Sequence, residues 1–178
     1  MIVNASPLII FGKLNKISIL KKIYKNIEIS SKVYEEVVLK GIEQNARDAF
    51  IAKQCIDDKE IKVFNLDKKF LDVSNKIQAI YDIDIGEAET IALALQLNQK
   101  EIIVDETAAR EAAKSLGIRA IGSLRVLLVA YRDNLISKEE INKLIAAMQD
   151  SKYRFSPKVL IEFWDLFGKI KKKRNKNY

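Results

Sequence analysis

Residues 86–105 read GEAETIALALQLNQKEIIVD, and they join an alanine-rich pattern to a short β-branched run. Apolar residues recur at helical spacing over residues 87–97, which predicts a helix. Residues 101–104 predict a buried strand, and Asp105 follows directly at its end. A helix that leads into a strand ending in an acid is typical of an α/β domain.

The same alternation extends in both directions along the chain. Short apolar runs predict strands at residues 2–4, 27–29, 61–64, 101–104 and 118–121. We expect Ser6-Pro7 to end the first strand, and Ser30 or Ser31 to cap a helix carrying Val33, Val37 and Val38. Helical spacing marks further helices at residues 8–24, 43–56, 68–80, 87–97, 106–115, 123–133, 138–149 and 157–170.

This order of elements predicts an α/β fold in three layers, α/β/α. Alternating strands and helices form βαβ units, whose right-handed crossovers build a central, mostly parallel sheet covered on both faces. We expect four or five strands in that sheet. The domain is predicted at residues 1–133, with a helical extension packed on it at residues 134–168 and a basic tail at residues 169–178.

The net charge of +7 lies largely in the last ten residues, which hold six basic residues and no acid. Such a run is usually solvated and disordered, and the alternative is attachment to nucleic acid. The residues of that alternative are Lys171, Lys172, Lys173 and Arg174. No apolar stretch is long enough to span a membrane, so we expect a cytoplasmic protein with no membrane partner.

Composition removes several kinds of chemistry. The chain has no histidine and one cysteine, Cys55, so it holds no Ser-His-Asp triad, no histidine general base and no internal disulfide. A bound metal ion would therefore have oxygen ligands, which indicates Mg²⁺ or Mn²⁺.

Polar and acidic side chains gather at the carboxyl ends of the predicted strands, where doubly wound sheets bind their ligands. Some follow the strands directly and others begin helices near the same edge. The residues are Asn4, Ser6, Glu36, Glu87, Asp105, Glu106 and Ser123. Because like charges repel strongly at low dielectric, a divalent cation is the ordinary compensation for such a group.

Common nucleotide-binding motifs do not occur at this edge. No GxGxxG follows the first strand, and the chain has no GxxxxGK[ST], which argues against a dinucleotide dehydrogenase and a P-loop enzyme. A phospho-receiver domain needs acids after its first strand and a lysine after its fifth. This chain has Asn4-Ala5-Ser6 and Gly122-Ser123 there instead.

Four segments resemble the PIN-domain ribonucleases, close to the VapC-like toxins of toxin–antitoxin pairs. They are VNASPLI at 3–9, VYEEV at 33–37, GEAETIALALQL with EIIVDETAAR at 86–110, and LGIRAIGSLRVLL at 116–128. The resemblance covers roughly residues 1–133. It implies a metal-dependent endoribonuclease that cleaves single-stranded RNA with Mg²⁺ or Mn²⁺, forms a homodimer and is restrained by a cognate antitoxin.

Carried over residue by residue, the resemblance implies that Asn4, Glu36, Glu87 and Asp105 line the metal site. Glu89 and Glu106 are implied neighbours. We expect Asp105 to bind the metal directly because it is short and ends a strand, and Glu87 to be the second ligand. With no histidine, a carboxylate or metal-activated water acts as general base.

The remaining polar residues have smaller expected roles. We expect Asn4 to orient a water or bind the metal weakly, and Glu36 to act through a water or to position the nucleophile. Ser6 hydrogen-bonds a phosphate or a carboxylate. Arg110 lies one helical turn after Glu106, which predicts a surface ion pair between them.

One position departs from the typical family pattern. Asn4 stands where a typical member has aspartate, and its amide contributes a carbonyl oxygen without charge. This departure supports a second hypothesis, a catalytically weak PIN-like module that binds nucleic acid or a protein partner.

Overall fold

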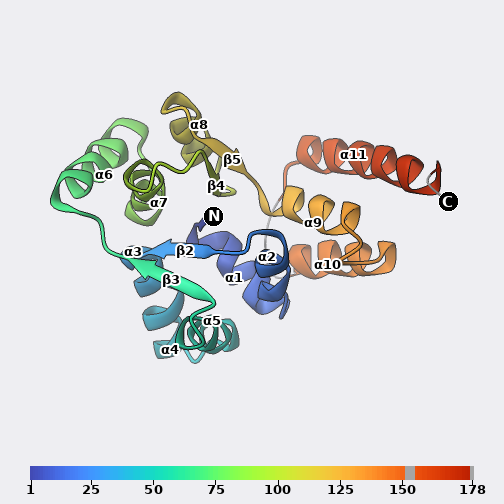
Figure 1. Cartoon of the computed structure of the whole chain (residues 1–178), viewed down its shortest axis with the longest axis horizontal. Coiled ribbons are helices and arrows are strands. Elements are labelled where there is room, and N and C mark those ends of the chain that lie inside the picture. The colour runs from blue at the N-terminus through green and yellow to red at the C-terminus, as the bar shows by residue number, and fades with distance from the viewer. Residues whose placement is uncertain (151–154, 177–178) are drawn as a thin grey trace. The chain divides into compact units, whose positions relative to one another are not determined.

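The computed structural model describes the backbone of residues 1–150 and 155–176, and the side chains of residues 1–150 and 155–170. The chain divides into two units, Met1–Ser123 and Leu124–Tyr178. The first unit contains the sheet and its covering helices, and the second consists largely of helices (Figure 1).

The first unit is built on a five-stranded sheet with strand order β3-β2-β1-β4-β5. All of its neighbouring strands pair in parallel. The strands are β1 (Ile2–Val3), β2 (Ile27–Ser30), β3 (Ile61–Phe64), β4 (Glu101–Ile103) and β5 (Arg119–Ile121). The predicted α/β fold with a central parallel sheet is confirmed, and all the predicted strands form.

The switch point of the sheet lies between β1 and β4. From β1 the chain builds outward to β2 and β3, then returns and builds β4 and β5 on the other side. Val3 pairs with Ile103, and the Asn4 N–H donates to the Ile103 carbonyl at 2.9 Å. The residues that follow β1 and β4 therefore leave the sheet side by side, where such folds bind their ligands.

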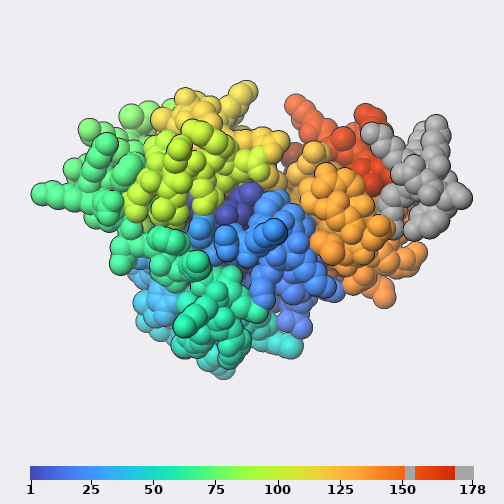
Figure 2. Space-filling view, in the orientation of Figure 1, coloured from blue at the N-terminus to red at the C-terminus, as the bar shows by residue number. Residues whose placement is uncertain are grey.

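Helices cover both faces of the sheet. α7 packs on β1, β2 and β4, with α6 and α8 beside it, while α5 packs on β3 and on α1. Figure 1 shows α6 and α7 on one side of the strands and α4 and α5 on the other, and Figure 2 shows the green side chains of α6 and α7 packed together. The helical elements of this unit are α1 (Ala5–Lys13), α2 (Ile17–Ile23), α3 (Ser31–Tyr34), the π-helical turn η1 (Glu35–Leu39), α4 (Lys40–Glu43), α5 (Arg47–Asp57), α6 (Lys68–Tyr81), α7 (Ile85–Gln96) and α8 (Thr107–Ser115).

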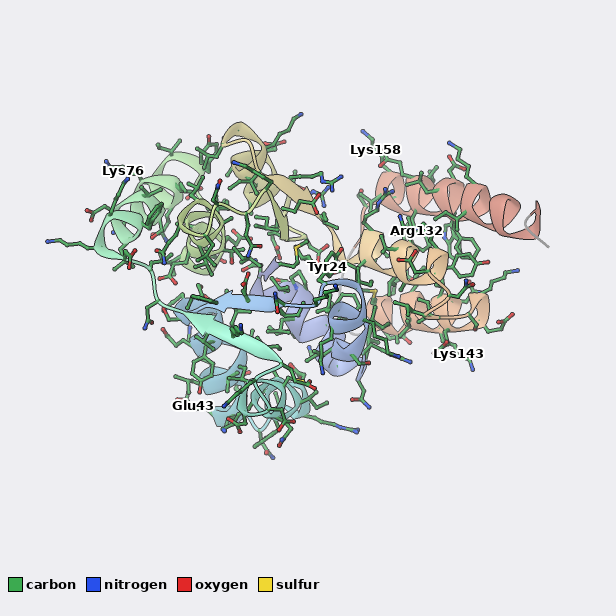
Figure 3. All side chains as sticks on the ribbon, viewed as in Figure 1. Tyr24, Glu43, Lys76, Arg132, Lys143 and Lys158 are labelled. Atoms are coloured by element: carbon green, nitrogen blue, oxygen red, sulfur yellow. The ribbon has the colours of Figure 1, made fainter. Side chains whose placement is uncertain are left out.

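α7 is the central helix of the unit. Its residues from Gly86 to Ala94 are all buried, which is why its sequence carries small alanines where other helices alternate with polar residues. Alanine allows a close approach to the strands and favours the helix. The outer helices instead extend charged side chains into solvent, as Lys76 on α6 and Glu43 on α4 do in Figure 3.

The start of the first helix differs from the sequence prediction. Ser6 and Pro7 form no turn between the first strand and the first helix. They lie inside α1, which begins at Ala5, directly after Asn4. Proline fits the first turn of a helix, where its missing N–H would have no intrahelical partner. The single helix predicted at residues 8–24 is two helices, α1 and α2, separated near Asn15, which has a positive φ of 53°.

Two other helix ends follow the sequence signals. The Ser30 hydroxyl accepts a hydrogen bond from the Val33 N–H at 3.2 Å, which confirms the predicted cap before α3. Gly117 follows the end of α8 with a φ of +74°, a conformation that glycine adopts without steric cost.

The second unit contains α9 (Ser123–Arg132), whose first residue belongs to the first unit, together with α10 (Lys138–Asp150) and α11 (Pro157–Lys176). Aromatic rings join two of these helices, with the Tyr131 and Phe167 ring centroids 4.6 Å apart. Lys143 on α10 and Lys158 on α11 are exposed (Figure 3). The basic run expected to be disordered is helical as far as Lys176, and its side chains from residue 171 onward lie outside the described residues.

Substitution of Gly41 by alanine tests the close packing of α4 on α5. A Cβ at Gly41 would lie 2.5 Å from the Ala49 Cβ, so one helix must move. We expect Gly41→Ala to lower the free energy of unfolding by about 1–3 kcal/mol in urea denaturation, although alanine favours helix. The double variant Gly41→Ala/Ala49→Gly removes the collision and should recover part of the loss. Wild-type stability of Gly41→Ala alone would contradict the packing.

Candidate functional site

Asn4 occupies the centre of the candidate site, at the switch point of the sheet. It is 2% exposed and lies between the end of β1 and the start of α1. Its Oδ1 accepts a hydrogen bond from the Thr90 hydroxyl at 3.2 Å, and the same hydroxyl donates to the Gly86 carbonyl at 2.7 Å. Thr90 lies one turn after Glu87 on α7, so this contact ties the end of β1 to the first turn of α7.

Glu87 is a buried carboxyl group in that first turn of α7. Its Oε2 accepts a hydrogen bond from the Asp84 N–H at 3.1 Å, which closes the start of the helix. Burial raises the pKa of Glu87 to about 7, and the negative charges of Glu106 and Asp84 add to the increase. Glu87 is therefore half protonated near neutral pH when no cation is present.

Glu106 approaches Glu87 from the other side of the switch point. The two carboxyl groups are within hydrogen-bonding reach of each other. Glu106 also accepts a hydrogen bond at 2.8 Å from the hydroxyl of Ser6, which is 100 positions away in the sequence. Of the two partners predicted for Ser6, a phosphate or a carboxylate, the structure shows a carboxylate, that of Glu106. The predicted ion pair between Glu106 and Arg110 is not formed.

The carboxylate of Asp105 is bound to the start of α9. Its Oδ1 accepts from the Ser123 N–H at 2.7 Å, and its Oδ2 accepts from the Ser123 hydroxyl at 2.5 Å. These contacts hold the Asp105 carboxylate at Ser123, just after the end of β5.

Glu36 reaches the same helix start from the opposite direction. It lies in the π-helical turn η1, a rare geometry that is frequent at functional sites. A Cβ at Gly86 would lie 2.7 and 2.8 Å from its two carboxylate oxygens, so a side chain there would push the Glu36 carboxylate away. Burial raises the pKa of Glu36, while Lys40 and Lys32 act in the opposite direction.

Glu89 is bound to the start of α3. It is 8% exposed, and its Oε2 accepts a hydrogen bond from the Lys32 N–H at 3.2 Å, at the start of α3. This contact joins α7 to α3 and suits a carboxylate near a helix N-terminus.

The structure thus brings Asn4, Glu87 and Glu106 to one edge, with Glu36 and Asp105 on either side. Sequence reasoning missed the contributions of Thr90 and Gly86. Both lie in the GEAET segment, and their spacing from Glu87 was the available signal. No three acidic side chains among the described residues converge closely enough to form a ready metal site.

The donor set nevertheless suits a hard divalent cation. Glu87 and Glu106 are two carboxyl groups within hydrogen-bonding reach, and the negative charge of Glu106 helps to raise the pKa of Glu87. Carboxylate and amide oxygens are the ligands that Mg²⁺ and Mn²⁺ prefer. The pair of Glu87 and Glu106, with the Asn4 carbonyl oxygen nearby, is the part of the edge that would hold such an ion.

These features define a class of protein: a doubly wound α/β domain with acidic side chains at its switch point. A family model described as a PIN domain matches residues 1–169. The chain belongs to the PIN-domain family, which has a nuclease-type fold and whose members are generally nucleases that use divalent metals. A search of curated proteins gave no match. Within the described ranges, no helix is long and apolar enough to cross a membrane.

The raised pKa of Glu87 predicts a pH-dependent stability in the absence of metal. Between about pH 4.3, the usual glutamate pKa, and pH 7, the folded protein keeps a proton that the unfolded chain releases. The free energy of unfolding should therefore fall as pH rises through this window, by about 1–3 kcal/mol. Glu87→Gln should flatten this slope in urea denaturation with EDTA, from pH 4.5 to pH 8.

The matched control is Glu111→Gln, which changes an exposed acid on α8 and should keep the wild-type slope. An identical slope in wild type and Glu87→Gln would assign the pH dependence to other groups.

Proposed function

We propose that this chain is a metal-dependent endoribonuclease that cleaves phosphodiester bonds of single-stranded RNA. The observation that carries the proposal is the contact between Glu87 and Glu106 at the switch point of a PIN domain, beside the buried Asn4. A buried carboxyl group within reach of a second one is costly to maintain, and binding a divalent cation relieves that cost.

The metal would be Mg²⁺ or Mn²⁺, held by Glu87 and Glu106 with the Asn4 oxygen. When bound, it would neutralise charge on the phosphate and lower the pKa of the attacking water. Without it, the raised pKa of Glu87 keeps the carboxyl group about half protonated near neutral pH, and that proton must leave before the ion is bound. The Ser6 hydroxyl orients Glu106, and the Thr90 hydroxyl orients the Asn4 amide.

Asp105 and Glu36 complete the proposed set of acids. Asp105 is predicted to bind the metal directly, and in this structure its two oxygens accept hydrogen bonds from Ser123. We propose that it acts at the rim of the site in this arrangement. Glu36 acts through a water, since it faces the start of α7 across Gly86.

The biological role we propose is that of the toxin in a toxin–antitoxin pair. It rests on the resemblance to VapC-like toxins, which also suggests a cognate antitoxin protein and a homodimer. Lys171, Lys172, Lys173 and Arg174 would add sequence-independent RNA affinity that falls as salt rises. Expression of the wild-type chain in a bacterial host should arrest growth, measured as colony counts, and Glu87→Gln should not. Equal counts for wild type and variant would contradict the toxin role.

The second candidate function is a module that binds nucleic acid or a protein partner without useful catalysis. Two observations favour it: Asn4 supplies no charge where an aspartate is typical, and Asp105 is held by Ser123. Such a module would bind RNA equally well with and without a divalent metal.

A cleavage assay separates the two functions. We expect the wild-type chain to cut a 5′-labelled single-stranded RNA in Mn²⁺, and EDTA, Glu87→Gln and Glu106→Gln each to slow cleavage by about 100-fold or more. Asp105→Asn shows whether this acid is a ligand or a rim residue. Substitution of a rim residue should slow cleavage less than substitution of Glu87 or Glu106. Glu111→Gln is the charge-matched control and should cleave normally.

Cleavage that survives EDTA and both glutamine variants would contradict the assigned site. RNA binding without cleavage in any divalent metal would support the binding module instead.

A further inference from the structure

Arg110 is a positively charged side chain at the acidic edge that the proposed chemistry does not use. It lies on α8, one turn after Glu106, and is exposed. The obvious partner is Glu106, but the Glu106 carboxylate accepts from Ser6 and contacts Glu87 instead. Among the described residues, the guanidinium of Arg110 forms no ion pair or side-chain hydrogen bond.

The guanidinium of Arg110 lies over Gly122. A Cβ at Gly122 would be 2.8 Å from the Arg110 Nη1 and 3.1 Å from the Asp105 Oδ1. Gly122 links β5 to α9, at the same edge of the sheet as Asn4 and Glu106. The missing side chain therefore leaves a place for the guanidinium beside Asp105, and a larger residue would displace it.

The side chains around this guanidinium are acidic, so a cation among them can serve to attract a negatively charged ligand. An RNA strand that approaches the edge meets the carboxyl groups of Glu87, Glu106 and Asp105, which repel its phosphates. Arg110 is the cation that the described structure places at Gly122 among these acids. A guanidinium presents several N–H donors in a planar fork that matches two oxygens of a phosphate.

We propose that Arg110 binds a backbone phosphate of the RNA next to the bond to be cleaved, and that Gly122 keeps its place open. This proposal rests on the proposed ribonuclease function and names the residue that receives the strand. Arg110 counters the repulsion between the acids and the RNA, so the strand can enter a site whose own chemistry requires negative charge.

Binding without cleavage tests the proposal directly. The probe is a 5′-fluorescein single-stranded RNA, and its anisotropy is measured in EDTA so that no bond is cut. We expect Arg110→Ala to raise Kd by about 3- to 10-fold and to reduce the slope of log K against log salt by about 0.7, the value for one phosphate contact on a single strand. Arg110→Lys should keep the slope and recover part of the affinity, because it keeps the charge without the fork.

Two further variants control for charge and for place. Lys114→Ala removes an exposed cation one turn further along α8 and should change Kd by less than about twofold. Gly122→Ala keeps the arginine but fills its place, so it should weaken RNA binding in the direction of Arg110→Ala.

An unchanged Kd for Arg110→Ala, or an equal loss for Lys114→Ala, would overturn the proposal. A lower Tm for Arg110→Ala with unchanged Kd would show that Arg110 only braces Asp105, and this too would overturn it. Failure of the ribonuclease function would give a different result. No divalent metal would then support cleavage, while Arg110→Ala would still lower the RNA affinity measured in EDTA.

Discussion

The parallel pairing of β1 with both β2 and β4 is the constraint on which the candidate site depends. Because β4 returns to the side of β1 that β2 leaves open, the chain exits these two central strands in the same direction. Asn4 and Glu106 are thereby brought to one edge, and Ser6 contacts Glu106 although 100 positions separate these two residues in the sequence. Without that return crossover, the acids after β4 would have no contact with the start of α1.

The first turn of α7 concentrates the electrostatic cost of this arrangement. Glu87 lies in this turn, while Glu106 approaches it from the start of α8 and Glu36 from η1. Burial raises the pKa of both Glu87 and Glu36. Gly86 permits the approach, because a side chain there would occupy the space of the Glu36 carboxylate. Holding like charges this closely lowers the stability of the fold, which is a common property of functional sites.

The sequence predictions succeeded where local chemistry is sufficient and failed where it is not. Short β-branched runs identified all the strands of the sheet, and burial is complete in the central strand β1 and nearly so in β2 and β4, while β3 and β5 lie at the edges. The reading of Ser6-Pro7 as a break failed, because a proline in the first turn of a helix looks like a turn. The sequence placed Asp105 at the end of a strand but could not show that Ser123 binds both of its oxygens, and its role as a metal ligand stays a prediction.

The order of elements, the all-oxygen donor set and the region of the acids were all determined by the sequence itself, because periodicity and residue chemistry are local properties. Which carboxyl groups meet was decided only by the tertiary structure, since side-chain directions depend on partners distant along the chain. Glu106 contacts Glu87 and Ser6, Asp105 contacts Ser123, and Glu89 contacts α3. No spacing in the sequence specifies those partners, because each contact joins elements that come together only when the sheet has formed.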